Sequence, residues 1–219
     1  MPLQALKVPA LTILIGLGCM IQSADSASAG EDSKAYFAGG CFWCVEKDFE
    51  SVSGVGEVIS GYTGGTTADP DYTQVSSGDT GHYEAVEINY DSGAVSYERL
   101  LYLFFRSVDP TDAGGQFCDR GDSYRTAIFV TNEAERLAAE EAKTEAEAEL
   151  GQPIVTPIID ASEFYPAEDY HQNYYKSPEL ALTRRGIKTR AKAYKFYRAA
   201  CGRDEKVKQL WGETAPFTG

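Results

Sequence analysis

Nine residues, Ala38-Gly39-Gly40-Cys41-Phe42-Trp43-Cys44-Val45-Glu46, mark the point where a predicted strand turns into a predicted helix. Apolar residues at helical spacing follow the glycine pair, so the helix should begin at or near Cys41. Unpaired amide groups and the positive end of the helix dipole favour a thiolate at that position. Phe42 and Trp43 would then line an apolar pocket beside a reactive sulfur. The other interpretation is an ordinary turn with two buried cysteines.

The composition limits the classes of protein to which this chain can belong. It has 219 residues, of which 43% are hydrophobic, and this is ample for one sizeable core. The formal net charge of −13 argues against nucleic acid and anionic membranes as partners. We interpret the acidity as a well-solvated surface.

The first 29 residues have the organisation of a secretory signal peptide. Lys7 precedes a short apolar run, and Ala27-Ser28-Ala29 has the pattern of a cleavage site, so we expect cleavage before Gly30. The apolar run is too short for a membrane span. We therefore expect an exported protein, periplasmic in a Gram-negative source, with stable membrane association only if Cys19 is lipidated.

The next part of the chain contains predicted elements in the order β-α-β-β-α-β. That order is typical of the ferredoxin-like split βαβ fold, a two-layer α/β (α+β) sandwich. The third strand alternates well enough to predict one buried face. A long loop over residues 62–81 precedes it, and such loops are often functional. The strands are expected at residues 34–40, 55–61, 82–90 and 124–130, with helices from Cys41 and after the cap residue Ser96.

Further elements follow this unit. Asn132 opens an Ala/Glu-rich helix that ends near Gly151. A strand predicted at residues 154–160 contains Pro157, which is typical of a sheet edge. The aromatic-rich segment 166–201 is predicted to be helical.

The chain contains no internal repeat and no interior linker, so we expect one domain after the signal peptide. This domain covers residues 30–219. Its core is expected at about residues 34–175, with a C-terminal helical and loop extension over residues 176–219.

Four cysteines remain after signal cleavage: Cys41, Cys44, Cys118 and Cys201. A zinc site is poorly supported, because only His82 and His171 could complete it and there is no second C-x-x-C. A covalent haem would need a histidine after Cys44, where Val45 stands. Two interpretations stay open, namely a structural disulfide in an exported protein and a redox-active nucleophile at Cys41.

Several longer motifs occur between about Tyr36 and His171. They are Gly40-Cys41-Phe42-Trp43, Gly61-Tyr62-Thr63-Gly64-Gly65, Gly78-Asp79-Thr80-Gly81-His82-Tyr83-Glu84, and Asp119-Arg120-Gly121 with Tyr124-Arg125. In this order they resemble the motifs of the peptide methionine sulfoxide reductase A family. A lone C-x-x-C would carry no such specificity.

The resemblance implies reduction of methionine (S)-sulfoxide, free or within proteins, to methionine. It implies no metal and no other cofactor, and it implies a thioredoxin-like dithiol as the electron donor. Cys41 would attack the sulfoxide sulfur and become a sulfenic acid, while Glu84 would protonate the departing oxygen. Tyr72 and Tyr124 would hydrogen-bond to the same oxygen.

The resemblance also assigns the substrate contacts. Phe42 and Trp43 match the pocket for the substrate methyl group, and Asp119 matches a residue that holds the substrate backbone. His171 would support the pocket. An apolar, water-poor pocket agrees with the role of Glu84, because burial raises the pKa of a carboxyl and keeps it protonated near neutral pH.

This chain departs from the commonest form of the family in its cysteines. Cys44 stands where a glycine is frequent, Cys118 precedes Asp119, and a single late thiol, Cys201, replaces the glycine-rich tail that often carries recycling cysteines. The thiol that resolves the Cys41 sulfenic acid is therefore open. We rank the candidates Cys44, Cys201 and Cys118.

A function from another class is an exported thiol–disulfide oxidoreductase that uses Cys41-Phe42-Trp43-Cys44. Thr156-Pro157 would then serve as the proline loop of a thioredoxin-type site. The predicted order of strands and helices argues against it, because a split βαβ unit is not a thioredoxin fold.

Overall fold

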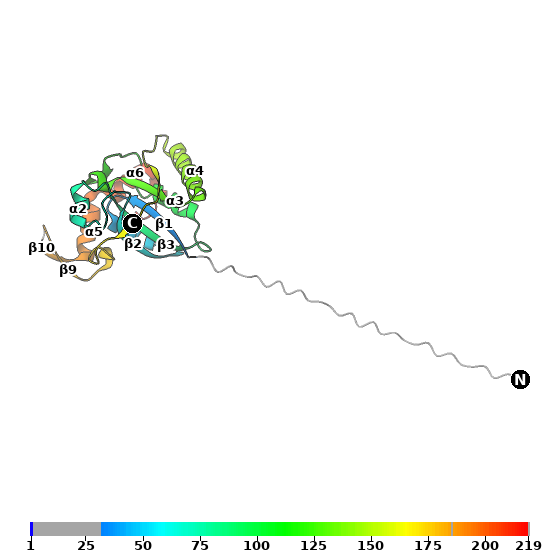
Figure 1. Cartoon of the computed structure of the whole chain (residues 1–219), viewed down its shortest axis with the longest axis horizontal. Coiled ribbons are helices and arrows are strands. Elements are labelled where there is room, and N and C mark those ends of the chain that lie inside the picture. The colour runs from blue at the N-terminus through cyan, green and yellow to red at the C-terminus, as the bar shows by residue number, and fades with distance from the viewer. Residues whose placement is uncertain (2–31, 185, 219) are drawn as a thin grey trace.

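A computed structural model of the chain describes Met1, residues 32–184 and residues 186–218 (Figure 1). The predicted signal peptide with Cys19, and the cleavage point before Gly30, lie outside the described residues. Within the described part, no helix combines the length and the apolar character that a membrane crossing requires.

A six-stranded mixed sheet lies at the centre of the molecule. Its strand order is β7-β6-β1-β3-β2-β8, and β7 is the strand that runs parallel to its neighbour. β3 lies between β1 and β2 and is antiparallel to both, so β1 and β2 run in the same direction without pairing. The strands are β1 (Asp32–Gly39), β2 (Val55–Thr63), β3 (Tyr83–Asp91), β6 (Thr126–Val130), β7 (Ile158–Asp160) and β8 (Tyr165–Pro166).

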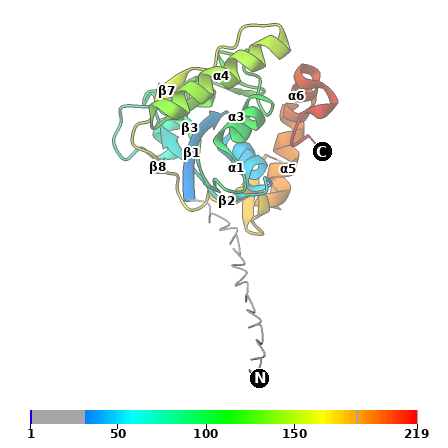
Figure 2. The ribbon, with the colours of Figure 1, turned by 90° about the vertical axis from the view of Figure 1, so that its right-hand side faces the viewer.

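Helices α1 (Phe42–Glu50) and α3 (Tyr97–Phe105) cover one face of this sheet. Phe37 of β1 packs between them, with its ring centroid 5.7 Å from that of Phe49 and 4.9 Å from that of Phe104. Helix α4 (Glu133–Leu150) packs against α3, and Figure 2 shows it on the outside of the molecule. The main hydrophobic core lies between the sheet and these helices.

The C-terminal part of the chain packs beside α1. Helices α5 and α6 follow one another along one flank of the domain (Figure 2), and a two-stranded hairpin precedes them. The remaining elements are α2 (Tyr72–Ser77), β4 (Gly115–Gln116), β5 (Asp119–Arg120), η1 (Asp122–Tyr124), η2 (Tyr174–Lys176), β9 (Leu180–Thr183), β10 (Gly186–Thr189), α5 (Arg190–Cys201), α6 (Arg203–Trp211) and η3 (Gly212–Thr214).

The predicted helix boundaries are confirmed where the sequence carries capping residues. The Ser96 hydroxyl accepts a hydrogen bond from the backbone amide of Arg99, as an N-cap does. Asn132 caps α4 in the same way, and Gly151 ends that helix in the left-handed conformation at φ +65°. These signals lie within one turn of the positions that they determine.

The prediction that the third strand has one buried face is wrong. Residues of β3 on both faces are buried, including the charged Glu84 and Glu87. The strand lies in the middle of the sheet, and its second face is covered by a separate cluster in which Tyr83 and Phe129 pack with Phe164. The polar residues of β3 therefore lie in the interior of the protein and do not form a solvent-exposed face.

The prediction of a helical segment over residues 166–201 is wrong for its first part. β8, η2 and the β9–β10 hairpin precede α5, which begins only at Arg190. The aromatic residues of this segment are not arranged along one face of a single helix. Several of them line a pocket that is described below. The long loop predicted at residues 62–81 contains the short helix α2, and the segment 109–123 contains the β4–β5 pair.

The proline in the last predicted strand marks a sheet edge, as expected. β7 begins directly after Pro157 and lies at the end of the sheet. The strand is shorter than predicted, because it begins at Ile158 rather than at residue 154.

Two glycines of β2 provide a test of the packing at the other edge. A Cβ atom at Gly61 would lie 2.5 Å from the carbonyl oxygen of Tyr165 in β8, whereas at Gly56 the nearest atom is 3.5 Å away. We expect Gly61→Ala to lower the free energy of unfolding by about 1–3 kcal/mol, because backbone must move. Gly56→Ala is the matched control and should be neutral or slightly stabilising. Urea unfolding measures both, and equal effects would contradict the β2–β8 packing.

Candidate active site

The predicted site residues surround one small pocket of about 130 Å³. They come from five places in the chain: the start of α1, the start of α2, the start of β3, the β4–β5 turn and η1. The structure therefore brings together residues that lie as far apart in the chain as Cys41 and Tyr124. The lining residues are Cys41, Phe42, Trp43, Tyr72, Glu84, Asp119, Tyr124 and Tyr197, of which only Tyr197 was not predicted.

Cys41 is the N-cap residue of α1, as the sequence predicts. Its carbonyl oxygen accepts the amide of Cys44 at 3.0 Å, and its side chain is 6% exposed. The preceding Gly40 has a φ of +80°, and a Cβ there would lie only 2.5 Å from Cβ of the buried Gln116. Position 40 therefore requires a glycine, and the turn at Gly40 places the Cys41 thiol next to the sheet.

Glu84 lies at the start of β3, opposite the first turn of the helix. The backbone amide of Phe42 donates a hydrogen bond to its Oε2 at 3.0 Å. The side chain is only 2% exposed, and burial raises the pKa of the carboxyl to about 8, although the Phe42 amide partly opposes the shift. Glu84 therefore carries a proton at neutral pH and faces the same pocket as the Cys41 thiol.

Two tyrosines complete the polar side of the pocket. The Tyr124 hydroxyl hydrogen-bonds to Tyr72 and to Glu84, and burial raises the pKa of both phenols. Both hydroxyls therefore remain donors at neutral pH. Tyr72 is the first residue of α2. Its backbone amide donates a hydrogen bond to Oε1 of Glu168 at 3.0 Å, and this contact holds Tyr72 in place.

The apolar side of the pocket is a group of stacked rings. The Trp43 indole stacks on Tyr174, with centroids 3.8 Å apart and planes at 7°. His171 lies behind it, 4.9 Å from the Phe42 ring and 5.6 Å from the indole. Burial lowers the pKa of His171 to about 4, so its ring is neutral and packs as an aromatic group. This placement agrees with the predicted supporting role.

Sequence reasoning missed two residues that shape the site, the half-buried Tyr197 and the buried Glu46. Tyr197 of α5 donates a hydrogen bond to the Asp119 carboxylate, so the C-terminal extension closes the pocket. Glu46 of α1 is fully buried, and it accepts hydrogen bonds from Ser60 at 2.8 Å and from the Asn173 amide at 2.6 Å. The one sequence feature that pointed to Tyr197 was its place among the aromatic residues of a predicted helix. No sequence feature pointed to Glu46 as part of the site.

Cys41 and Cys44 are unbonded, buried and adjacent. Burial and the hydrogen bond with Cys44 raise the pKa of the Cys41 thiol, which differs from the expected thiolate because desolvation outweighs the helix terminus. The hydrogen bond from Cys41 and the guanidinium groups of Arg203 and Arg198 lower the pKa of Cys44 to about 7. At neutral pH the pair is therefore partly ionised, and the two arginines favour the negative charge on Cys44 over Cys41.

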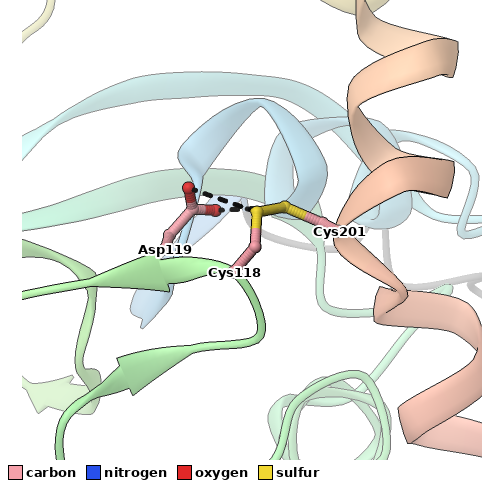
Figure 3. The surroundings of a disulfide bond; sticks show 3 residues. All are labelled: Cys118, Asp119 and Cys201. Carbon is pink, nitrogen blue, oxygen red and sulfur yellow. Dashed lines mark hydrogen bonds between the residues drawn. A yellow bond between two sulfur atoms is a disulfide. The ribbon is translucent and has the colours of Figure 1, made fainter.

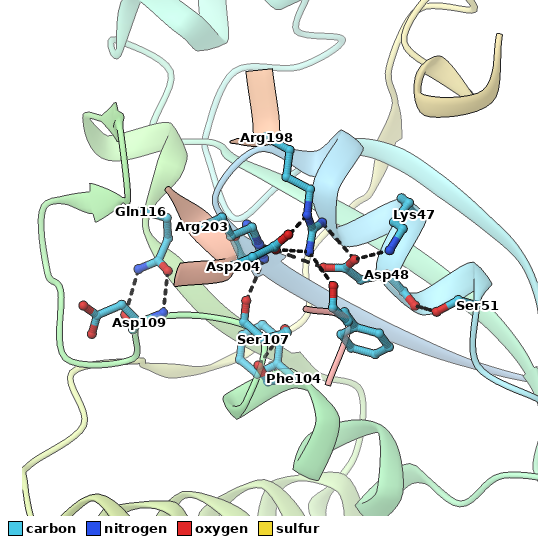
Figure 4. A network of polar contacts seen from close by, with 12 residues as sticks. Lys47, Asp48, Ser51, Phe104, Ser107, Asp109, Gln116, Arg198, Arg203 and Asp204 are labelled. Atoms are coloured by element: carbon cyan, nitrogen blue, oxygen red, sulfur yellow. Dashed lines mark hydrogen bonds and ion pairs between the residues drawn. The ribbon is translucent and has the colours of Figure 1, made fainter. Parts of the chain in front are cut away.

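The two arginines belong to a buried polar network beneath α1 (Figure 4). Arg198 Nη1 lies 2.9 Å from Asp48 Oδ1, and Arg203 Nε lies 3.9 Å from Oδ2 of the same carboxylate. Arg203 also donates to the carbonyl oxygens of Gly39 at 3.1 Å and Ser107 at 2.9 Å. The network joins α5 and α6 to the end of β1 directly below the cysteine pair.

The other two cysteines form a disulfide, Cys118–Cys201, which joins the β4–β5 turn to the last residue of α5 (Figure 3). Cys201 therefore lies at a helix end rather than on a loose tail. The Asp119 carboxylate lies beside the bond, with Oδ2 4.0 Å from the Cys201 sulfur. Because the two sulfurs are bonded to each other, they offer no thiolate to a metal in this state.

Comparisons with known proteins agree with this geometry. Residues 33–212 match the family described as peptide methionine sulfoxide reductase. The chain is 50% identical over 189 residues to peptide methionine sulfoxide reductase MsrA 2 of Rhizobium meliloti, a match that covers 86% of this chain and 88% of that protein. It is 47% identical over 180 residues to peptide methionine sulfoxide reductase MsrA of Listeria innocua, with 81% and 95% covered.

Solved structures are similar as well. The crystal structure of Mxr1 from Saccharomyces cerevisiae in reduced form superposes with a TM-score of 0.63 at 30% identity, over 66% of this chain and 84% of that one. Methionine sulfoxide reductase A of Corynebacterium diphtheriae superposes with a TM-score of 0.59 at 31% identity, over 68% of this chain and 76% of that one.

Because the Glu84 carboxyl is buried, we expect the free energy of unfolding to depend on pH. Because the pKa of Glu84 is about 8 in the folded protein, against 4.5 for an unperturbed glutamate, the folded state binds more protons between these values. Its contribution is therefore fully present at low pH and is lost as the pH rises towards 8, by at most about 1.4 kcal/mol per pH unit. We expect Glu84→Gln to gain stability relative to the parent protein over this range, in urea unfolding at a series of pH values.

The matched control for this titration is Glu57→Gln, which removes the same charge from an exposed position of β2. Parallel pH profiles for the parent protein and Glu84→Gln would show that Glu84 does not hold its proton in the folded state.

Proposed function

The chain belongs to the peptide methionine sulfoxide reductase family, and we propose that it reduces methionine sulfoxide, free and within proteins, with Cys41 as nucleophile and Glu84 as proton donor. One observation carries this assignment. A buried thiol and a buried, protonated carboxyl face the same pocket, and two phenol donors stand beside them. This is the set of groups that removal of an oxygen from sulfur requires.

The reaction can be written with these groups alone. The Cys44 thiolate accepts the proton of the Cys41 thiol, and the Cys41 sulfur attacks the sulfoxide sulfur. Glu84 protonates the sulfoxide oxygen as it leaves the substrate, because an unprotonated oxide is a very poor leaving group. Tyr72 and Tyr124 donate hydrogen bonds to the charge that develops on that oxygen. The protonated oxygen then moves from the substrate sulfur to Cys41 as the bond between the two sulfurs breaks. Cys41 is left as a sulfenic acid, and methionine is released.

The shape of the pocket supports discrimination between the two sulfur epimers. The Phe42 and Trp43 rings form an apolar side for the substrate methyl group, while Glu84 and the phenols form a polar side for the oxygen. Asp119 lies at the rim, where the substrate main chain would lie. A site that fixes three different substituents accepts one configuration, and by its family that is the S epimer.

We infer that Cys44 resolves the sulfenic acid. It hydrogen-bonds to Cys41, and the pKa of its thiol is about 7, whereas Cys118 and Cys201 are already bonded to each other. Cys44 gives up the proton that it took from Cys41, and its sulfur attacks the Cys41 sulfur. The hydroxyl of the sulfenic acid leaves with that proton as water, and a Cys41–Cys44 disulfide forms. A thioredoxin-like dithiol then reduces this disulfide by exchange and is itself oxidised to a disulfide.

The thiol–disulfide oxidoreductase alternative is not favoured. Pro157 does not line the pocket that holds Cys41, and it precedes an edge strand on a different part of the sheet. A proline loop that faces the C-x-x-C cysteines is therefore lacking at this position.

We also propose the finer description of the fold, a ferredoxin-like split βαβ sandwich in one domain over residues 30–219. The order β6-β1-β3-β2, with β3 antiparallel to both β1 and β2, supports it. Because Tyr197 and Arg203 of the C-terminal extension contact the pocket and the end of β1, the extension belongs to the same folded unit.

Export remains part of the proposal. A signal peptide cleaved before Gly30 would leave β1, which begins at Asp32, intact. The Cys118–Cys201 disulfide supports an oxidising compartment such as the periplasm.

The reaction is tested with residues 30–219, dithiothreitol, and the separated S and R epimers of a methionine sulfoxide derivative. We expect reduction of the S epimer, no reduction of the R epimer, and loss of all activity in Cys41→Ser because the attacking sulfur is gone. Methionine formation is measured by chromatography. Activity of Cys41→Ser equal to that of the parent protein would refute the nucleophile, and absence of reduction of both epimers would refute the function.

The resolving thiol is tested with Cys44→Ser. In single-turnover experiments this variant should still form one methionine per Cys41, because the first step does not consume Cys44, but it should do so more slowly because the group that takes the Cys41 proton is gone. With thioredoxin, thioredoxin reductase and NADPH, its turnover should fall at least about 100-fold, since no disulfide forms. The control is the double variant Cys118→Ser/Cys201→Ser, which should keep thioredoxin-driven turnover. The opposite pattern would assign resolution to Cys201 or Cys118.

A further inference from the structure

A second, larger groove opens directly beside the catalytic pocket. It has a volume of about 640 Å³, against about 130 Å³ for the pocket. Trp43, Asp119 and Tyr197 line both, so the two spaces are continuous. The floor of the groove contains the Cys118–Cys201 disulfide and one side of α5.

The β9–β10 hairpin forms the outer wall of this groove, and Figure 1 shows it projecting from the body of the domain. In the hairpin Ala181 pairs with Lys188 and Leu182 pairs with Ile187, so successive residues point to opposite faces. Lys188 and Thr183 lie on the face that lines the groove. Leu182 and Ile187 lie on the other face, where they are exposed.

The groove combines aromatic rings with unpaired positive charge. Trp43 and Tyr174, which stack on each other, lie at its inner end together with Tyr197. Arg184 and Lys188 lie at its outer wall, and neither forms an ion pair with any residue in the described part of the chain. The protein has a net charge of −13, so these two cations make a locally positive region beside the active site.

We propose that this groove binds an acidic segment of polypeptide next to the oxidised methionine, a proposal that rests on the function proposed above. The catalytic pocket has room for a side chain but not for the chain that carries it. The flanking residues must therefore leave past Trp43, Asp119 and Tyr197, and the groove begins at these residues. Aspartate or glutamate there would pair with Arg184 and Lys188, while apolar neighbours would pack on the rings.

The size of the effect follows from the exposure of the two cations. Single exposed ion pairs contribute little, and salt screens them. Two pairs formed with one peptide should change kcat/KM by about fivefold at low ionic strength, and high salt should remove most of the difference. The groove therefore sets a preference among protein substrates and is not required for the reaction.

The test compares peptides of equal length that contain one central methionine (S)-sulfoxide. Aspartate, serine or lysine residues flank it on the N-terminal side, the C-terminal side or both, and N-acetyl methionine sulfoxide serves as a substrate without flanks. The purified protein is assayed with dithiothreitol, so no protein reductant competes for the surface. Fluorescence anisotropy of labelled peptides on Cys41→Ser measures binding without turnover.

The key variant is Arg184→Glu/Lys188→Glu. Its matched control is Lys192→Glu/Lys195→Glu, which makes the same change of charge at exposed positions of α5 that do not line the groove. Neither variant changes a residue of the catalytic pocket. Both should reduce N-acetyl methionine sulfoxide as well as the parent protein does.

We expect the parent protein and the control to prefer aspartate over lysine flanks by about fivefold in kcat/KM, on at least one side of the sulfoxide. The key variant should lose or invert this preference, and the binding curves should change in the same direction. Equal use of all peptides by the parent protein would overturn the proposal. So would an equal loss in the control, which would indicate the overall charge of the protein rather than the groove.

Other occupants of the groove give different results. If the key variant slows turnover only with thioredoxin, the groove is the surface for the reductant and the proposal fails. If the key variant changes the sedimentation coefficient but not the peptide preference, the groove is an interface between two copies and the proposal fails as well. Absence of reduction of N-acetyl methionine sulfoxide by the parent protein would instead refute the proposed function, while anisotropy would still decide whether acidic peptides bind.

Discussion

The hydrogen bond from the Phe42 amide to the Glu84 carboxyl is the contact on which the catalytic pocket depends. It uses one of the amide groups that a helix leaves unpaired at its first turn, and it gives a buried carboxyl the partner that such a group needs. The same contact sets the distance between α1 and β3, and with it the position of the Cys41 thiol. The surrounding rings exclude water, and the exclusion keeps Glu84 protonated.

A second buried interaction connects the C-terminal helices to this arrangement. Asp48 lies between Arg198 and Arg203, and buried charges of this kind are tolerated only when their hydrogen-bonding groups are paired. Two backbone carbonyls accept hydrogen bonds from Arg203, which satisfies part of that need. The guanidinium groups also act on Cys44, whose thiolate they stabilise. Segments that the sequence places in an extension therefore tune the chemistry of the central pair.

The four cysteines in the described part of the chain have separate roles. Cys41 and Cys44 are buried together at the pocket, whereas Cys118 and Cys201 close a covalent link between the β4–β5 turn and α5. That link holds Asp119 and Tyr197 near each other, and these two residues lie where the pocket and the groove meet. The C-terminal extension thus closes the small pocket for the side chain and builds the larger surface beside it.

The sequence alone determined the order of the core strands and helices, the caps at Ser96 and Asn132, and the motif residues of the pocket, because these signals are local or belong to a recognisable family pattern. Only the tertiary structure decided that β3 is buried on both faces, that a hairpin precedes α5, and that Cys118 pairs with Cys201 across 83 residues. It also decided that the pKa of Cys44 is lowered and that of Cys41 is raised. Burial and long-range charges set these properties, and neither is encoded in the spacing of neighbouring residues.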